Sequence, residues 1–109
     1  MPRERLPDRR PNETLDLVYD GTLYAVTVGF QPDTGAPREI FTHGARVGSS
    51  MDAILGDACI LLSILLQHRV EPAALARSMG RLGRGGQAAS VIGALTGLLA
   101  ERAQDRGAP

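Results

Sequence analysis

The first half of the fold is set by residues 14–30, which read TLDLVYDGTLYAVTVGF. Apolar residues alternate along both halves of this stretch, with the period of two that is typical of β-strands with one buried face. Asp20-Gly21 separates the halves, and both residues tolerate the positive φ that a type I′ turn requires. We therefore predict a β-hairpin with strands over residues 14–19 and 23–30. The apolar side chains on its predicted buried face are Leu15, Leu17, Tyr19, Tyr24, Val26, Val28 and Phe30.

A shorter third strand is predicted over residues 38–42, after a turn that contains Pro32 and Gly35. The apolar period then changes to 3.6, which predicts a long helix from Ser49 or Ser50 to about Arg69. This helix is apolar over most of its circumference, so we expect it to be buried at the centre of the fold and to lie across the sheet. Its predicted apolar face carries Ile54, Leu55, Ala58, Leu61, Leu62, Leu65 and Leu66.

Two further helices complete the chain. Pro72 fits the first turn of a short helix that ends before Gly80. A last helix is predicted from about residue 88 to 102, with one apolar stripe. The fold class is therefore α+β: a three-stranded antiparallel meander, a long buried helix, a short helix and a last amphipathic helix.

Length and composition predict one domain. The 109 residues, 43% of them apolar, have room for a single core over residues 13–102. We expect residues 1–12 to form a flexible basic arm and residues 103–109 to form a frayed tail. One cysteine allows no internal disulfide, the opening residues do not resemble an apolar leader, and the apolar run over residues 58–66 is too short for a bilayer. These features predict a cytoplasmic protein with no membrane contact.

Asp57 is the acidic residue that we expect inside the fold. At 100° per residue it lies between Leu61 and Ile64 on the helical wheel, within the apolar sector. A buried carboxylate needs a partner, and an arginine of another element is the natural one. We predict a structural ion pair; a ligand or interface contact is the alternative.

Arginine is the only basic residue type, and it gathers in two places. Arg9 and Arg10 belong to a cluster in the first ten positions, whereas Arg77, Arg81 and Arg84 alternate with glycines before the last helix. Guanidinium groups bind phosphate as a fork, and amides at a helix start favour anions. We predict that these five residues bind a phosphate-bearing partner. The alternatives are a compositional bias toward arginine and a merely flexible connector.

No self-contained active site emerges from the remaining polar residues. The two histidines, His43 and His68, have no second histidine, cysteine or acid at ligand spacing, so we predict neither a metal site nor a cofactor. Cys59 is interpreted as a small core residue. Gly93 and Gly97 lie on one helix face, where a second subunit would fit closely; we therefore expect a homo-oligomer.

A resemblance to a known family is carried by several segments. They read GSSMD over residues 48–52, DA over 57–58, LSILLQH over 62–68 and VEP over 70–72, with LPDRR over 6–10 and SVIGAL over 90–95. The chain thereby resembles the TSCPD domain, the C-terminal module of vitamin B12-dependent ribonucleotide reductases, and short stand-alone bacterial proteins of that type. The family's signature has a cysteine where Ser50 stands and a proline where Met51 stands, so the resemblance implies no thiol role here.

The resemblance implies a function without reductase activity, since the chain is too short for the reductase barrel with its radical-forming cysteines. We expect a non-catalytic accessory module that is linked to nucleotide reduction or DNA metabolism. Its expected partner is a ribonucleotide reductase subunit, a nucleotide or a nucleic acid. Two alternatives stay open: a homo-oligomeric nucleic-acid-binding protein, and a subunit that contributes to an enzyme site at an interface.

Overall fold

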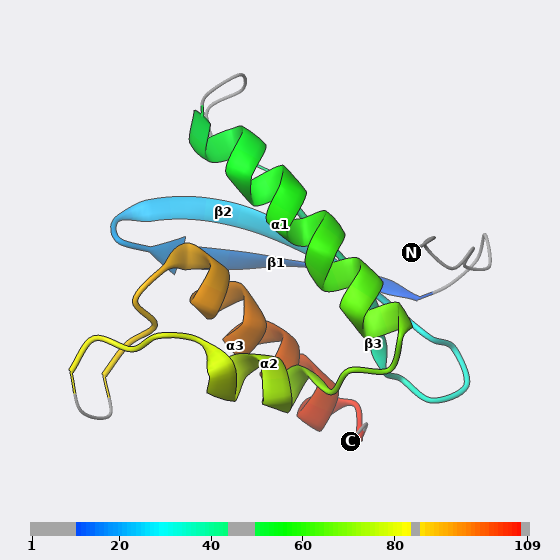
Figure 1. The fold of residues 1–109 in the computed structure, drawn as a ribbon. Helices are drawn as coiled ribbons and strands as arrows, with labels where there is room; N and C mark the ends of the chain where they lie inside the picture. Colours follow the sequence, from blue (N-terminus) through cyan, green and yellow to red (C-terminus); the bar gives the residue numbers. More distant parts are fainter. Residues whose placement is uncertain (1–10, 44–49, 84–85, 108–109) are drawn as a thin grey trace.

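Three strands precede three helices in the computed structural model, which describes residues 11–43, 50–83 and 86–107. This order confirms the predicted α+β class, and no strand follows residue 50 in the described ranges beyond an isolated bridge between Arg81 and Ala88. The elements are β1 (Asn12–Tyr19), β2 (Thr22–Phe30), β3 (Pro37–His43), α1 (Ser50–Gln67), α2 (Pro72–Ser78) and α3 (Val91–Asp105) (Figure 1).

The sheet is the predicted antiparallel meander, with strand order β1-β2-β3. The β1–β2 hairpin closes at Asp20 and Gly21, whose φ angles of 49° and 77° fit the expected turn. Tyr19 pairs with Thr22 across it, so the register places alternate residues of both strands on one face. That face holds the core, where Val26, Val28, Phe30 and Ile40 are fully buried.

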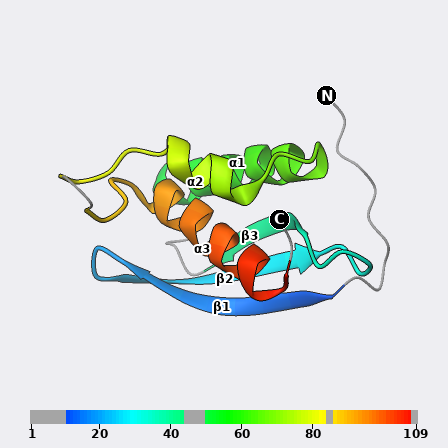
Figure 2. The ribbon, with the colours of Figure 1, turned by 90° about the horizontal axis from the view of Figure 1, so that it is seen from below.

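The helices all cover the same face of the sheet (Figure 2). α1 packs along β3, and α2 packs against α3. On the uncovered face, alternate residues of β1 are exposed, among them the apolar Val18, and Leu23 is exposed beside it on β2. The molecule therefore has two layers and one open sheet face.

Three side chains of α1 make polar contacts with β3. Ser63 Oγ accepts a hydrogen bond from Ile40 N at 3.0 Å, and Gln67 Nε2 donates one to Arg38 O at 3.2 Å. One turn earlier, Cys59 Sγ donates to Thr42 Oγ1 at 3.8 Å. These α1 residues recur every four positions, so one stripe of the helix supplies partners to β3, the edge strand that pairs with β2 on one side only.

α1 is buried on one side only, so the expectation that it is a fully central helix is wrong. Leu55, Leu62 and Leu66 are almost completely buried, as predicted. Because only β3 and the core lie beneath the helix, the rest of its apolar circumference faces outward. Its exposed apolar side chains are Met51, Ile54, Ile60, Leu61 and Leu65.

α3 is fixed at both ends. Ser90 caps its start, since Ser90 Oγ accepts from Gly93 N at 3.1 Å. Near its end, Arg102 makes a paired contact with Glu13 of β1, at 2.9 Å for Nε–Oε1 and 3.0 Å for Nη2–Oε2. The helix continues to Asp105 and buries Ala103, so it extends into the stretch that we expected to be a frayed tail.

Candidate functional site

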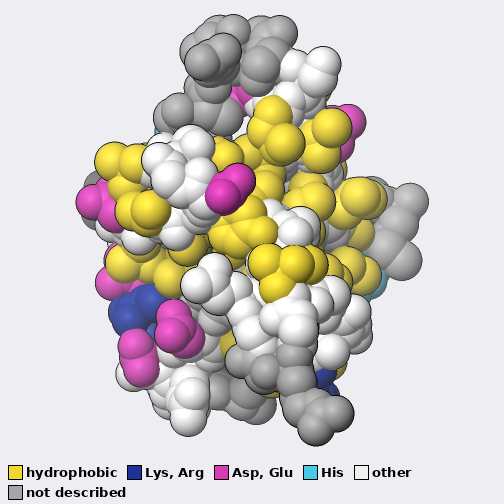
Figure 3. Space-filling view, turned by 90° about the vertical axis from the view of Figure 1, so that its left-hand side faces the viewer, with side chains coloured by type: hydrophobic (Ala, Val, Ile, Leu, Met, Phe, Trp, Pro, Cys, Tyr) yellow, Lys and Arg dark blue, Asp and Glu magenta, His cyan; other side chains and the backbone are white. Residues whose placement is uncertain are grey.

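A pocket of about 610 Å³ opens at the end of the molecule where three distant segments meet. It is lined by the tip of the β1–β2 hairpin, the first turns of α1 and the entrance to α3. Figure 3 views this end and shows hydrophobic side chains gathered over it. The lining residues are Tyr19, Asp20, Thr22, Tyr24, Met51, Ile54, Ala89, Ser90, Val91 and Ile92. Its size lies within the range of small-molecule sites.

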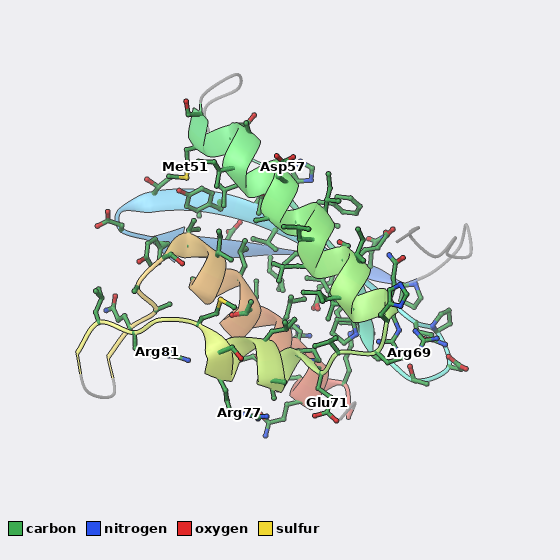
Figure 4. All side chains as sticks on the ribbon, viewed as in Figure 1. Met51, Asp57, Arg69, Glu71, Arg77 and Arg81 are labelled. Carbon is green, nitrogen blue, oxygen red and sulfur yellow. The ribbon has the colours of Figure 1, made fainter. Side chains whose placement is uncertain are left out.

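The pocket adjoins the segment that carries the family resemblance. Met51 belongs to that segment, and its side chain lies on the side of α1 that faces the hairpin (Figure 4). Ser50 begins α1 and is exposed, whereas residues 48 and 49 lie outside the described ranges. The described part of this segment thus enters α1 at the rim of the pocket.

A second surface is formed by an apolar stripe on α1. Met51, Ile54, Ala58, Leu61 and Leu65 follow one another at spacings of three, four, three and four residues. The four large side chains are exposed by 48%, 53%, 63% and 38% in that order, whereas Ala58 between them is 9% exposed and belongs to the core. This spacing is typical of a seam that packs against another helix. We refer to these five residues as the α1 stripe.

α1 also has the length and apolar composition of a membrane-spanning helix, alone among the helices in the described part of the chain. This apolar stretch is longer than residues 58–66, from which the sequence analysis predicted that no segment is long enough to span a bilayer. In the fold, 39% of the helix is buried, on the side that contacts β3 and the core. Core helices of folded domains meet the same criterion, so the absence of membrane contact stays a prediction.

Asp57 is exposed, so its predicted burial is wrong. No ion pair of its carboxylate occurs within residues 11–43, 50–83 and 86–107. Figure 4 places it on the other side of α1 from Met51. The helical wheel placed Asp57 correctly beside Leu61, but Leu61 itself faces outward. The sector of the α1 helical wheel that is apolar is wider than the sector that is buried in the fold, and Asp57 lies in the exposed part of it.

The predicted arginine site is described only in part. Arg9, Arg10 and Arg84 lie outside the described residues. Arg77, in the last turn of α2, and Arg81, in the connector, are both exposed, and neither has an ion pair in the part of the chain that the structure covers. Phosphate binding by the five arginines therefore stays a prediction.

Arg81 lies beside the flank of α3. It lines a pocket of about 330 Å³ with Gly93, Gly97 and Glu101, between α3 and β1. The space beside Gly93 is already occupied by a residue of the same chain, since a Cβ at Gly93 would come within 3.1 Å of Ala88 Cβ. The close contact that we expected a second subunit to make at Gly93 is thus made by the connector itself, whereas Gly97 stays open.

Nucleophilic and metal-binding chemistry finds little support in the described residues. Cys59 is 3% exposed, and this burial raises the pKa of its thiol, an effect that the hydrogen bond with Thr42 partly offsets. His43 and His68 are exposed. Within the described ranges, no three histidine, cysteine or acidic side chains gather as metal ligands do.

Neither the pocket nor the α1 stripe was predicted as a site. The pocket has no sequence signal, because residues 19–24, 51–54 and 89–92 meet only in the fold. The stripe has one: its alternating spacing of three and four residues is visible in the sequence. The sequence analysis assigned the residues of the stripe to the same face as the buried residues of the helix, because both sets are apolar.

Comparisons with known proteins identify the family. No curated protein and no solved structure matches the chain. The family model of the TSCPD domain matches residues 3–103, which is nearly the whole sequence and includes every strand and helix described above up to the last turn of α3. This chain therefore belongs to the TSCPD domain family.

Proposed function

We propose that this chain is a non-catalytic accessory module that binds another protein through the α1 stripe. The observation that carries the proposal is the exposure of Met51, Ile54, Leu61 and Leu65 on one side of a helix whose other side is fixed to β3. Four large apolar side chains in one row form the kind of contiguous patch that marks interaction surfaces. The row is held rigidly, since its helix packs along the sheet.

The proposed partner is a ribonucleotide reductase subunit. Support comes from membership in the TSCPD domain family, whose domain forms the C-terminal module of vitamin B12-dependent reductases. A module that is covalently attached in one protein and separate in another has to restore the contact through a surface. The α1 stripe is suited to a helix of the partner, because its four exposed side chains recur at the spacing with which two helices pack side by side.

The test measures binding of the purified chain to the reductase of the same cell by calorimetry. We expect Leu61→Glu to weaken binding by roughly tenfold or more, because a charge would be buried at the contact. Leu82→Glu is the matched control: Leu82 is 60% exposed against 63% for Leu61, but lies in the connector. Equal affinities for both variants and the unmodified chain would refute the role of the stripe.

A second copy of the chain is the competing occupant of the stripe. Met51, Ile54, Leu61 and Leu65 form one exposed row, so the stripes of two α1 helices can pack against each other in an antiparallel pair. Sedimentation equilibrium over a wide concentration range separates the two cases. A dimer that Leu61→Glu dissociates, in a chain that does not bind the reductase, would replace the proposed partner by self-association.

A further inference from the structure

Tyr24 is a buried residue with an unused hydroxyl group. It is 7% exposed and lines the pocket at the hairpin end. No hydrogen bond of its hydroxyl is present among the described residues, and its oxygen is not one of the fully enclosed unsatisfied atoms. The remaining exposure of Tyr24 therefore includes this oxygen, and Tyr24 is one of the residues that line the pocket. Tyr19, by contrast, donates its hydroxyl to Ala88 O at 2.9 Å.

The entrance to α3 supplies two more donors. Ser90 Oγ accepts from Gly93 N, and Ser90 O accepts from Ala94 N. The amides of Val91 and Ile92 have no acceptor in the described structure, as the first amides of a helix usually do not. Both residues line the pocket, and their N–H groups point out of the helix start. Two amides and the Tyr24 hydroxyl are thus available at one cavity.

The rest of the lining limits what can bind. Met51 and Ile54 form an apolar wall, which suits an apolar body. Asp20 lies on the rim and adds a negative charge. The amides and the dipole of the 15-residue α3 favour a negative charge in the pocket, whereas the Asp20 carboxylate repels it, and this repulsion grows with the charge of the ligand.

We propose that this pocket binds a monocarboxylate with an apolar body. The carboxylate accepts hydrogen bonds from the amides of Val91 and Ile92 and from the Tyr24 hydroxyl, and the apolar body lies against Met51 and Ile54. The groups that hold the carboxylate, on Tyr24, Val91 and Ile92, are not part of the α1 stripe, whereas the apolar wall of Met51 and Ile54 is shared with it, so a partner on the stripe and this ligand would contact the same two side chains. The site lies at the end of the molecule where the family signature enters α1.

The test is a titration of the full chain, followed by NMR of the backbone amides. With 3-phenylpropionate as the probe, we expect saturable shifts centred on Tyr24, Val91 and Ile92. 3-Phenylpropanamide lacks the charge and phenyl phosphate carries nearly two, so both should bind at least about tenfold more weakly. Shifts that are absent, or that lie away from these residues, would overturn the proposal.

Two variants separate binding from folding. Tyr24→Phe removes a hydroxyl that has no partner in the fold, so its melting temperature should not fall, while affinity for 3-phenylpropionate drops roughly tenfold. Asp20→Asn keeps a residue that tolerates positive φ and should strengthen binding of phenyl phosphate. Unchanged affinity in Tyr24→Phe would contradict the assignment.

One further probe identifies the source of the carboxylate. An acetylated tetrapeptide that ends in leucine presents the same group as the C-terminus of a polypeptide. Tighter binding of this peptide than of 3-phenylpropionate assigns the site to a chain end, and weaker binding assigns it to a small molecule. The control is the same peptide with an amidated C-terminus, which lacks the carboxylate and should not bind in either case. Binding of the amidated peptide would count against the site.

Discussion

Ser63 on α1 accepts a hydrogen bond from the backbone N–H of Ile40 on β3 over 3.0 Å, and its own hydroxyl lies 3.4 Å from Ile40 O. Both residues are fully buried. One serine therefore provides a partner for both backbone groups of Ile40, an edge-strand residue that lies opposite Val28 of β2. The same helix that presents an apolar stripe outward uses its polar side chains inward, to hold the sheet.

Ser63→Ala should destabilise the protein more than its small change in volume implies. Both backbone groups of Ile40 would lose their partner inside the fold, which costs about 1–3 kcal/mol for a buried unsatisfied group. Ser78→Ala is the control, because Ser78 Oγ donates to Ala74 O on the exposed side of α2. Urea unfolding measures both variants, and a loss below about 0.5 kcal/mol for Ser63→Ala would mean that water replaces the serine.

The orientation of α1 is tested by two neighbouring leucines. Leu62 is 5% exposed and Leu61 is 63% exposed. Leu62→Ala should cost about 2–5 kcal/mol through the cavity that it leaves, whereas Leu61→Ala should stay within about 0.5 kcal/mol. Thermal or urea unfolding of the two variants gives the comparison. Similar losses would show that both sides of the helix are covered in solution.

These leucines also show where sequence reasoning succeeds. Apolar residues occupy every second position of β2 from Tyr24 to Phe30, so the period of two assigned Tyr24, Val26, Val28 and Phe30 to the core, and all four are buried. Asp20-Gly21 fixed the turn, since few residue pairs tolerate positive φ at both positions. Where one face of a strand is mostly apolar and the other mostly polar, the alternation predicts which side chains point into the core.

α1 shows where the same reasoning fails. Its circumference is apolar on both sides, so periodicity could not tell Leu62 from Leu61, and Asp57 was placed inside with them. The polar residues indicate the orientation of α1 better than the apolar ones do. Ser63 and Gln67 lie one turn apart, and both are on the side of the helix that contacts β3. The pocket was beyond reach altogether, because Tyr24 and Val91 become neighbours only through the tertiary fold.

The buried thiol of Cys59 predicts a pH dependence of stability. Burial raises its pKa above the ordinary value of 9.0, so the unfolded chain loses the thiol proton at lower pH than the folded chain does. The contribution is fully present below pH 9 and is lost as the pH rises through the folded pKa. Unfolding free energies from pH 7 to 10.5 should therefore fall more steeply for the unmodified chain than for Cys59→Ala. Parallel curves would show that the thiol ionises equally in both states.

The exposed arginines give a last prediction, about a phosphate-bearing partner. Arg77 and Arg81 are exposed and have no ion pair in the described part of the chain, so the double variant Arg77→Ala/Arg81→Ala should fold with a stability change of about 0.5 kcal/mol or less per site.

If both arginines contact phosphates, the slope of log affinity for single-stranded DNA against log salt should fall by about 0.7 for each contact removed. Arg106→Ala is the control, compared per charge removed, since it removes one positive charge at the other end of α3, where Arg106 lies 3.6 Å over the ring of Phe30. Fluorescence titrations at several salt concentrations decide the outcome. An unchanged slope in the double variant, or an equal change in the control, would assign these arginines to solvation of the surface and leave protein binding as the function of the module.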